Sequence, residues 1–333
     1  MSSSRDSTFD VLKGIAIISM VIGHCELPGS WGHFISSFHM PLFFFVSGYF
    51  LKPRAVLEEV KLSSKRLLVP YCFTAVFICL GALIEDVQHY TYADGSHTKN
   101  TIIAYLLGLR SDFVFDDYGH VGVLWFILAL FWSRIIVVSL LRYVKSQNVQ
   151  LTIVFVLAFV GIFLSREIPV PYCIFQSFGA SGFVYVGYLM RKYVFFEQRN
   201  LSRCFPFLLM VWFYCLTESY VSMVSVGFGL SYIFDMVGAA GAVALLHVVV
   251  KSMNNGSFFW RTLNFWGRYS LVIYCVHSVE FALSNWKAFA LLNHIPLAHF
   301  TLFQVSARML IAFAFTMLLL RIKPIRQQIF QIE

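Results

Sequence analysis

The sequence predicts an all-α polytopic membrane protein with about ten transmembrane helices and both termini in the cytoplasm. Of its 333 residues, 59% are hydrophobic and only 13% are charged, whereas a soluble domain has roughly 25% charged residues. The apolar residues come in runs near the twenty residues that cross a bilayer as a helix. The basic residues collect in alternate connections between these runs, which indicates the orientation of the chain.

Ten apolar runs account for the expected spans. They cover residues 9–27, 34–51, 67–86, 121–141, 149–165, 174–190, 204–224, 230–250, 269–286 and 301–320. With the N-terminus placed inside, nineteen Lys and Arg residues fall in internal segments and four in external ones. This asymmetry is what the positive-inside rule requires. No long polar stretch could build a separate soluble domain, so we expect one integral-membrane domain over residues 1–333.

Charge and cysteine content exclude other classes. The formal net charge of +8 follows the predicted membrane topology, so it does not indicate a nucleic-acid partner. The seven cysteines are scattered without the spacing of a metal site or a disulfide framework, so no metal is expected. The N-terminal apolar run holds Lys13 and His24, which does not fit a cleaved signal peptide.

Three ionisable residues of the first predicted span, Asp10, Lys13 and His24, share one helical face. At about 100° per residue, Lys13 and His24 lie only ~20° apart around the helix, and Asp10 is one turn before Lys13. Ionisable side chains at membrane depth are costly and are candidates for function. Alternatively, Asp10 and Lys13 form an interfacial i,i+3 pair, and only His24 needs a functional explanation.

A second polar stripe lies in the ninth predicted span. Ser270, Tyr274 and His277 share one helical face, with Glu280 at its edge. This face is either the wall of a site or a seam between packed helices.

Two arginines, Arg134 and Arg308, fall near the centres of predicted spans. An uncompensated positive charge there costs at least ~2.5–3.5 kcal/mol. We expect each arginine to pair with Glu218, Asp235 or Glu280, or else to bind an anionic donor or acceptor.

Two connections stand out. The outer connection from Glu85 to His120 is long and acidic, with a short helix expected at TIIAYLLGL, and is either the outer mouth of a site or a solvated connector. The inner segment from Lys52 to Arg66 combines five basic residues with two glutamates and is expected to be an amphipathic cytoplasmic segment.

These features together resemble acyltransferase family 3, ten-helix membrane enzymes that move acyl groups, usually acetyl, from acyl-CoA to extracytoplasmic acceptors, mostly sugars. The matching residues are Asp10, Lys13, Gly14 and His24 in the first helix, the run Pro41 to Gly48, then Lys65, Arg66, Pro70 and Tyr71, the LWFILALF stretch at 124–131, and Ser270, Tyr274 and His277. LWFILALF, which includes Trp125, is similar to the sugar-acetylase branch. Two departures concern how CoA phosphates are held: Lys13 replaces the usual arginine, and Leu62 and Ser63 stand where an Arg-x-x-Arg pattern would begin.

The resemblance implies catalysis at His24. Lys13 and Asp10 would either stabilise the polar face of this helix or attract the donor's negative charge. His24 is about 16 residues into the span, roughly 24 Å along the helix, and therefore towards the outer leaflet. It suits either a general base for an acceptor hydroxyl or a covalent acyl carrier. Glu26 could orient His24 only if the helix breaks near Pro28.

The implied activity is that of a membrane-bound O-acetyltransferase in a bacterial inner membrane. It would use cytoplasmic acetyl-CoA to modify a hydroxyl of an extracytoplasmic carbohydrate, either a cell-surface polysaccharide or a lipid-linked glycan. The residues expected to bind the donor are Lys65, Arg66, Lys52 and Arg54, and those expected to bind the acceptor are Ser270, Tyr274, His277 and Trp125. A secondary transporter of a small polar solute is the alternative, although the paired repeats typical of transporters are not found.

Overall fold

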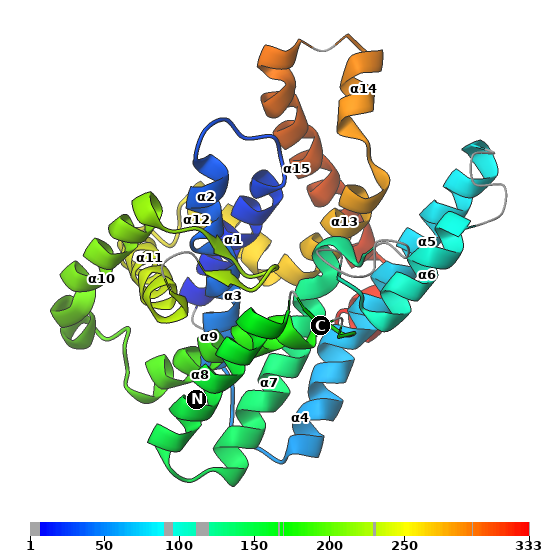
Figure 1. Ribbon diagram of the computed structural model, residues 1–333. Helices are drawn as coiled ribbons and strands as arrows, with labels where there is room; N and C mark the ends of the chain where they lie inside the picture. The colour runs from blue at the N-terminus through cyan, green and yellow to red at the C-terminus, as the bar shows by residue number, and fades with distance from the viewer. Residues whose placement is uncertain are drawn as a thin grey trace. The chain divides into compact units, whose positions relative to one another are not determined.

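The computed structural model describes residues 7–89, 96–110, 120–165, 167–168, 170–228, 231–294 and 296–332. It is 80% helical, and within these ranges the only strands are β1 (Val221–Ser222) and β2 (Gly227–Phe228), an antiparallel pair (Figure 1). The prediction of an all-α protein is therefore confirmed. The chain forms two compact units, and the boundary between them falls inside α9 and α13.

The first unit comprises segments 1–51, 183–223 and 227–273. Its helices are α1 (Thr8–Gly23), α2 (Trp31–Ser36), α3 (His39–Tyr49), the second half of α9 (Ile174–Lys192), α10 (Gln198–Glu218), α11 (Tyr232–Ser252) and α12 (Phe258–Arg268). The predicted span 34–51 is divided between α2 and α3. At this division Ser37 accepts a hydrogen bond from the indole of Trp212 at 3.0 Å, which fixes the break against α10.

Glycines bring helices of the first unit into backbone contact. A Cβ atom added to Gly14 would collide with the Leu263 carbonyl of α12, and one added to Gly267 would collide with the Asp10 carbonyl of α1. Small residues at helix crossings allow this close approach in membrane proteins. The helix that carries Asp10 and Lys13 is therefore held firmly against α12.

The second unit comprises segments 52–182, 224–226 and 274–333. Its elements are α4 (Val56–Ser63), the π-helix η1 (Ser64–Leu68), α5 (Val69–His89), α6 (Ser96–Leu107), η2 (Gly122–Leu124), α7 (Trp125–Tyr143), α8 (Gln147–Leu164), the first half of α9, most of α13 (Ser270–Leu283), α14 (Trp286–Leu292), α15 (Leu297–Arg321) and the π-helix η3 (Ile325–Ile329). The short helix expected at TIIAYLLGL is present as α6. Residues 90–95 and 111–119 of the long outer connection, with Asp94, Asp112, Asp116 and Asp117, lie outside the described residues.

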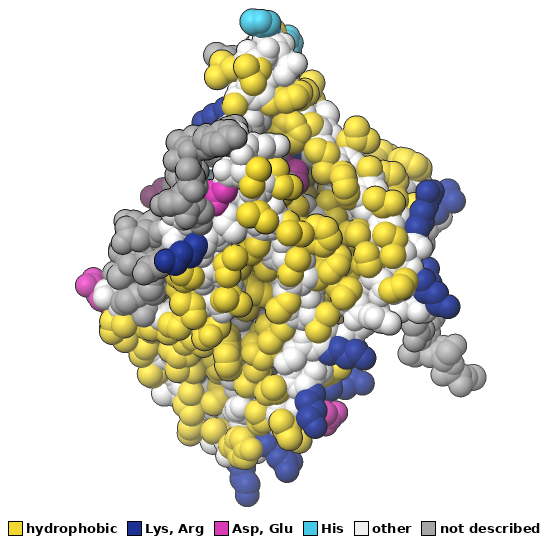
Figure 2. Space-filling model, turned by 90° about the vertical axis from the view of Figure 1, so that its right-hand side faces the viewer, with side chains coloured by type: hydrophobic (Ala, Val, Ile, Leu, Met, Phe, Trp, Pro, Cys, Tyr) yellow, Lys and Arg dark blue, Asp and Glu magenta, His cyan; other side chains and the backbone are white. Residues whose placement is uncertain are grey.

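Five helical stretches in the described part of the chain are long and apolar enough to cross a membrane. They are Val56–Gln88, Gly122–Tyr143, Gln147–Leu164, Tyr232–Ser252 and His299–Arg321, and α13 is a shorter apolar helix. Figure 2 shows a face on which hydrophobic side chains predominate, with most of its Lys and Arg side chains at the right and bottom of the view. Every predicted span contains a helix, but ten crossings and the cytoplasmic location of the termini stay predictions.

The third predicted span, residues 67–86, lies inside a longer helical stretch. One continuous helical stretch runs from Val56 to Gln88, because the π-turn η1 joins α4 to α5 without a break. Most of the inner segment expected to precede the span is therefore part of the same helix.

Candidate functional site

His24 lies at the C-terminal end of α1, where it is the capping residue rather than a residue within the helix. Its Nδ1 atom is 2.8 Å from the carbonyl oxygen of Met20. A carbonyl oxygen can only accept a hydrogen bond, so in the neutral ring the proton is on Nδ1 and the lone pair is on Nε2. A ring nitrogen that carries a lone pair is what a general base or a nucleophile requires.

The other two residues of the predicted stripe meet at the opposite end of α1. Lys13 Nζ and Asp10 Oδ1 are 2.7 Å apart, and both side chains are largely buried. Eleven residues separate Lys13 from His24, which is about 16 Å along a helix axis. The structure thus brings Asp10 and Lys13 together as an i,i+3 pair and leaves His24 too distant to touch them.

Aromatic rings surround Phe9, the residue that precedes Asp10. The ring of Phe9 lies 4.6 Å from that of Tyr49 and 5.7 Å from that of Phe196. Phe196 in turn lies 4.4 Å from the imidazole of His247, which is buried in α11. His247 was missed in the sequence because a single histidine in an apolar helix gives no local signal.

Near His24, helix α2 packs on the end of α1. A Cβ atom added to Gly23 would come within 3.0 Å of Ile35, and His33 of α2 lies 5.8 Å from the ring of Tyr220. Glu26 is exposed and lies two residues after the capping residue His24. The chain therefore leaves α1 before Pro28, the condition under which Glu26 could orient His24.

The basic residues predicted to bind the donor lie just before α4 and on η1. Lys52, Lys65 and Arg66 are exposed. Arg54 is instead paired, because its Nε atom is 3.2 Å from the buried carboxylate of Glu59.

Glu59 is also the partner of Arg134. The side chain of Glu59 has no exposed surface and accepts hydrogen bonds from Arg134 Nε at 2.8 Å and from Ser63 Oγ at 2.6 Å. The prediction that Arg134 pairs with Glu218, Asp235 or Glu280 was wrong. The helix that begins at Val56 packs along α7, and this contact brings Glu59, expected in a cytoplasmic segment, to the arginine.

The prediction for Arg308 was confirmed. Its Nε atom is 3.3 Å from Glu280, and the imidazole of His277 is 3.0 Å from the same carboxylate. Trp286 Nε1 and Ser284 Oγ also donate to Glu280. Two hydrogen-bond donors and two ion-pair partners thus surround one buried carboxylate in α13.

The remaining acceptor-binding candidates are mostly packed into the second unit. Tyr274 is buried and donates its hydroxyl hydrogen to the carbonyl of Val123, and its ring lies 5.6 Å from that of Phe126. Trp125 is buried beside Phe126 at 6.2 Å. Ser270 is half-buried at the start of α13 and belongs to the first unit. The contacts of Tyr274 are those of a residue packed between helices, the second of the two alternatives for this polar face.

A family model described as an acyltransferase domain, that of acyltransferase family 3, matches residues 6–321, nearly the whole chain. The chain belongs to acyltransferase family 3. No curated protein and no solved structure matches it significantly. Family membership together with the apolar helices makes it a membrane acyltransferase.

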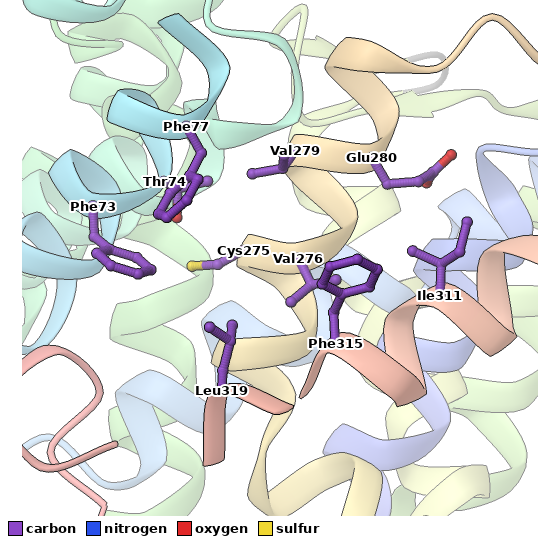
Figure 3. Close-up of a pocket in the computed structure, with 10 residues that line it drawn as sticks. All are labelled: Phe73, Thr74, Phe77, Cys275, Val276, Val279, Glu280, Ile311, Phe315 and Leu319. Carbon is purple, nitrogen blue, oxygen red and sulfur yellow. The ribbon is translucent and has the colours of Figure 1, made fainter. Parts of the chain in front are cut away.

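This acyltransferase also has a cavity of about 300 Å³ between α5, α13 and α15. Figure 3 shows Phe73, Thr74 and Phe77 on one side, residues of α13 in the middle, and Ile311 and Phe315 on the other side. Thr74 and Glu280 are the polar residues of its lining, so it suits a hydrocarbon group more than a sugar. Among the described residues, no three His, Cys, Asp or Glu side chains are grouped to hold a metal ion.

Proposed function

We propose that this acyltransferase moves acetyl from cytoplasmic acetyl-CoA to a hydroxyl of an extracytoplasmic carbohydrate, in the inner membrane of a bacterium. The family match over residues 6–321 carries the proposal. His24 supports it, because its hydrogen bond to Met20 leaves a lone pair on Nε2 in the neutral ring.

In the proposed reaction, the acceptor hydroxyl attacks the thioester carbonyl carbon of acetyl-CoA. His24 Nε2 takes the hydroxyl proton, the carbon–sulfur bond breaks, and the proton passes to the departing sulfur as CoA leaves as a thiol. In a second route the acetyl group first bonds to Nε2 and is then passed to the acceptor. Both routes need the same nitrogen and give the same products, an O-acetyl ester and CoA.

Basic residues at the cytoplasmic mouth would hold the donor. Lys65, Arg66 and Lys52 are exposed cations, and Arg54 is fixed in place by Glu59. Arginine can grip two phosphate oxygens at once, whereas lysine acts as a point charge. The Asp10–Lys13 pair would stabilise the helix that carries His24.

The proposed acceptor site includes Ser270, Tyr274, His277 and Trp125. Because Tyr274, His277 and Trp125 are buried, we assign them to shaping the wall of the site. Ser270 is the member of this set with the most accessible hydroxyl.

Thiol release from acetyl-CoA by the purified full chain tests the proposal, with and without a cell-surface polysaccharide or a lipid-linked glycan. We expect acceptor-dependent release of CoA and an acceptor heavier by acetyl groups. His24→Gln should lower the rate by at least about a hundredfold, the usual contribution of a general base. His299→Gln, which changes an exposed histidine of α15, is the matched control. Normal transfer by His24→Gln would overturn the role of His24, and absence of acetylated acceptor would overturn the substrate assignment.

A further inference from the structure

The segment that follows α15 folds back onto the start of the third predicted span. Phe330 is buried, and its ring lies 6.1 Å from that of Phe73 in α5. The side-chain amide of Gln331 donates a hydrogen bond of 2.6 Å to the backbone carbonyl of Lys65 in η1. The residues just after η3 therefore contact η1 and the start of α5, across more than 250 residues of sequence.

Both stretches at this junction carry basic residues. Lys65 and Arg66 are on η1, and Arg326 is on η3. The backbone N–H of Ile332 donates to the Arg326 carbonyl at 2.9 Å, which holds Arg326 in the same turn as Gln331. Because Gln331 contacts the Lys65 carbonyl, the turn that includes Arg326 lies against η1.

Arg326 has an unused donor at this junction. Its Nε atom is buried, yet it has no hydrogen-bond acceptor among the residues that the structure describes. A buried donor without an acceptor costs about 1–3 kcal/mol, more for a charged group. Such an atom indicates a place for an anionic acceptor.

No counter-charge neutralises the three cations within the described ranges. Lys65, Arg66 and Arg326 form no ion pair there. The two glutamates of the same helix are already engaged, Glu58 with Arg54 and Glu59 with Arg54 and Arg134.

We propose that η1 and η3 form one phosphate-binding site, in which Arg326 is an anchor that the family resemblance does not assign. Lys65 and Arg66 supply charge, and Gln331 keeps the segment after α15 in place. The ligand is a phosphate ester. It could belong to the nucleotide end of the donor, which rests on the proposed function, or to the headgroup of an anionic lipid, and the experiment separates these two sources.

The experiment measures binding to the full chain in detergent by calorimetry, without any acyl transfer. CoA is the first probe, and acetyl-pantetheine, which lacks the nucleotide, is its control. The second probe is phosphatidylglycerol vesicles, and the measurement is how much protein they retain compared with neutral vesicles. If the phosphate is that of the donor, Arg326→Gln weakens CoA binding about tenfold and leaves acetyl-pantetheine binding unchanged. If it is that of a lipid, the same variant loses retention on phosphatidylglycerol and binds CoA normally.

Three further variants make the test specific. Arg321→Gln removes an exposed guanidinium at the end of α15 and should change neither measurement. Arg326→Lys keeps the charge but lacks the planar guanidinium that can bind two phosphate oxygens. Its affinity should fall between those of the wild type and Arg326→Gln. Gln331→Ala keeps every charge but frees the segment, and should reproduce most of the loss. Unchanged binding of both probes by Arg326→Gln, in protein that melts like the wild type, would overturn the phosphate site whether or not acyl transfer is found.

Discussion

Arg134 Nε lies 2.8 Å from Glu59, a carboxylate with no exposed surface that stands 75 residues earlier in the chain. The same carboxylate holds Arg54 at 3.2 Å. One acidic side chain thus joins α4, α7 and the segment before α4, and its removal leaves two arginines without their shared partner.

Glu59→Ala is therefore expected to destabilise the protein by about 3–5 kcal/mol, the usual cost of removing one member of a buried ion pair. Thermal melting in detergent measures this as a lower transition temperature. Glu58→Ala is the matched control, because the Glu58 side chain is 64% exposed and its contact with Arg54 is long, at 3.7 Å. An exposed pair contributes about 0–1 kcal/mol, so equal melting of the two variants would contradict the assignment.

Lys13 is expected to act through its charge. Lys13→Arg should keep activity, since arginine can still pair with Asp10, whereas Lys13→Ala should lose about tenfold or more in acyl transfer, because a charge-assisted hydrogen bond contributes about 1.5–3 kcal/mol. The measurement is the rate of CoA release. Lys145→Ala removes an exposed lysine and serves as the control. Equal rates in all four proteins would make Lys13 an interfacial anchor.

The contact of α1 with α12 predicts a strong effect of a single methyl group. Gly267→Ala and Gly14→Ala would each press a Cβ atom into a backbone carbonyl of the other helix. Overpacking costs about 1–3 kcal/mol where side chains can move, and a backbone atom yields less than a side chain does. We expect little monodisperse protein in size-exclusion chromatography. Gly32→Ala, where no atom lies within 4 Å of the added carbon, should purify like the wild type.

The charge distribution predicts that Glu333 is cytoplasmic. Green fluorescent protein fused after Glu333 should fluoresce, and alkaline phosphatase fused at the same point should stay inactive, because the phosphatase needs the oxidising side of the membrane to form its disulfides. The opposite pattern would reverse the orientation of the last helix.

The positions of the helices could be predicted because long apolar runs signal them directly. Each of the ten runs contains a helix, and α6 and the Glu280–Arg308 pair were also predicted correctly. The end of α1 was placed too late, since the helix stops at Gly23 and the turn residues Pro28 and Gly29 come several residues afterwards.

Most long-range partners could not be predicted. Glu59 lies in a stretch whose composition is typical of a cytoplasmic segment, and nothing in the local sequence shows that it packs on α7. The contact of Gln331 with Lys65 spans 266 residues, and the cavity between α5, α13 and α15 depends on three separate helices. These relationships come from tertiary packing, which periodicity and composition do not encode.

The continuous stretch from Val56 to Gln88 has 33 residues, which corresponds to about 50 Å at the helical rise. The hydrocarbon layer is only about 30 Å thick, so on the order of 20 Å of this rod must project beyond it, less if the helix tilts. A rod of this kind cannot swing shut over a nucleotide as a hinged flap does. Lys65 and Arg66 would instead form a rigid, preformed phosphate-binding site at a fixed distance from the bilayer. The length of the donor's flexible pantetheine chain would then set how deeply its thioester can enter the protein.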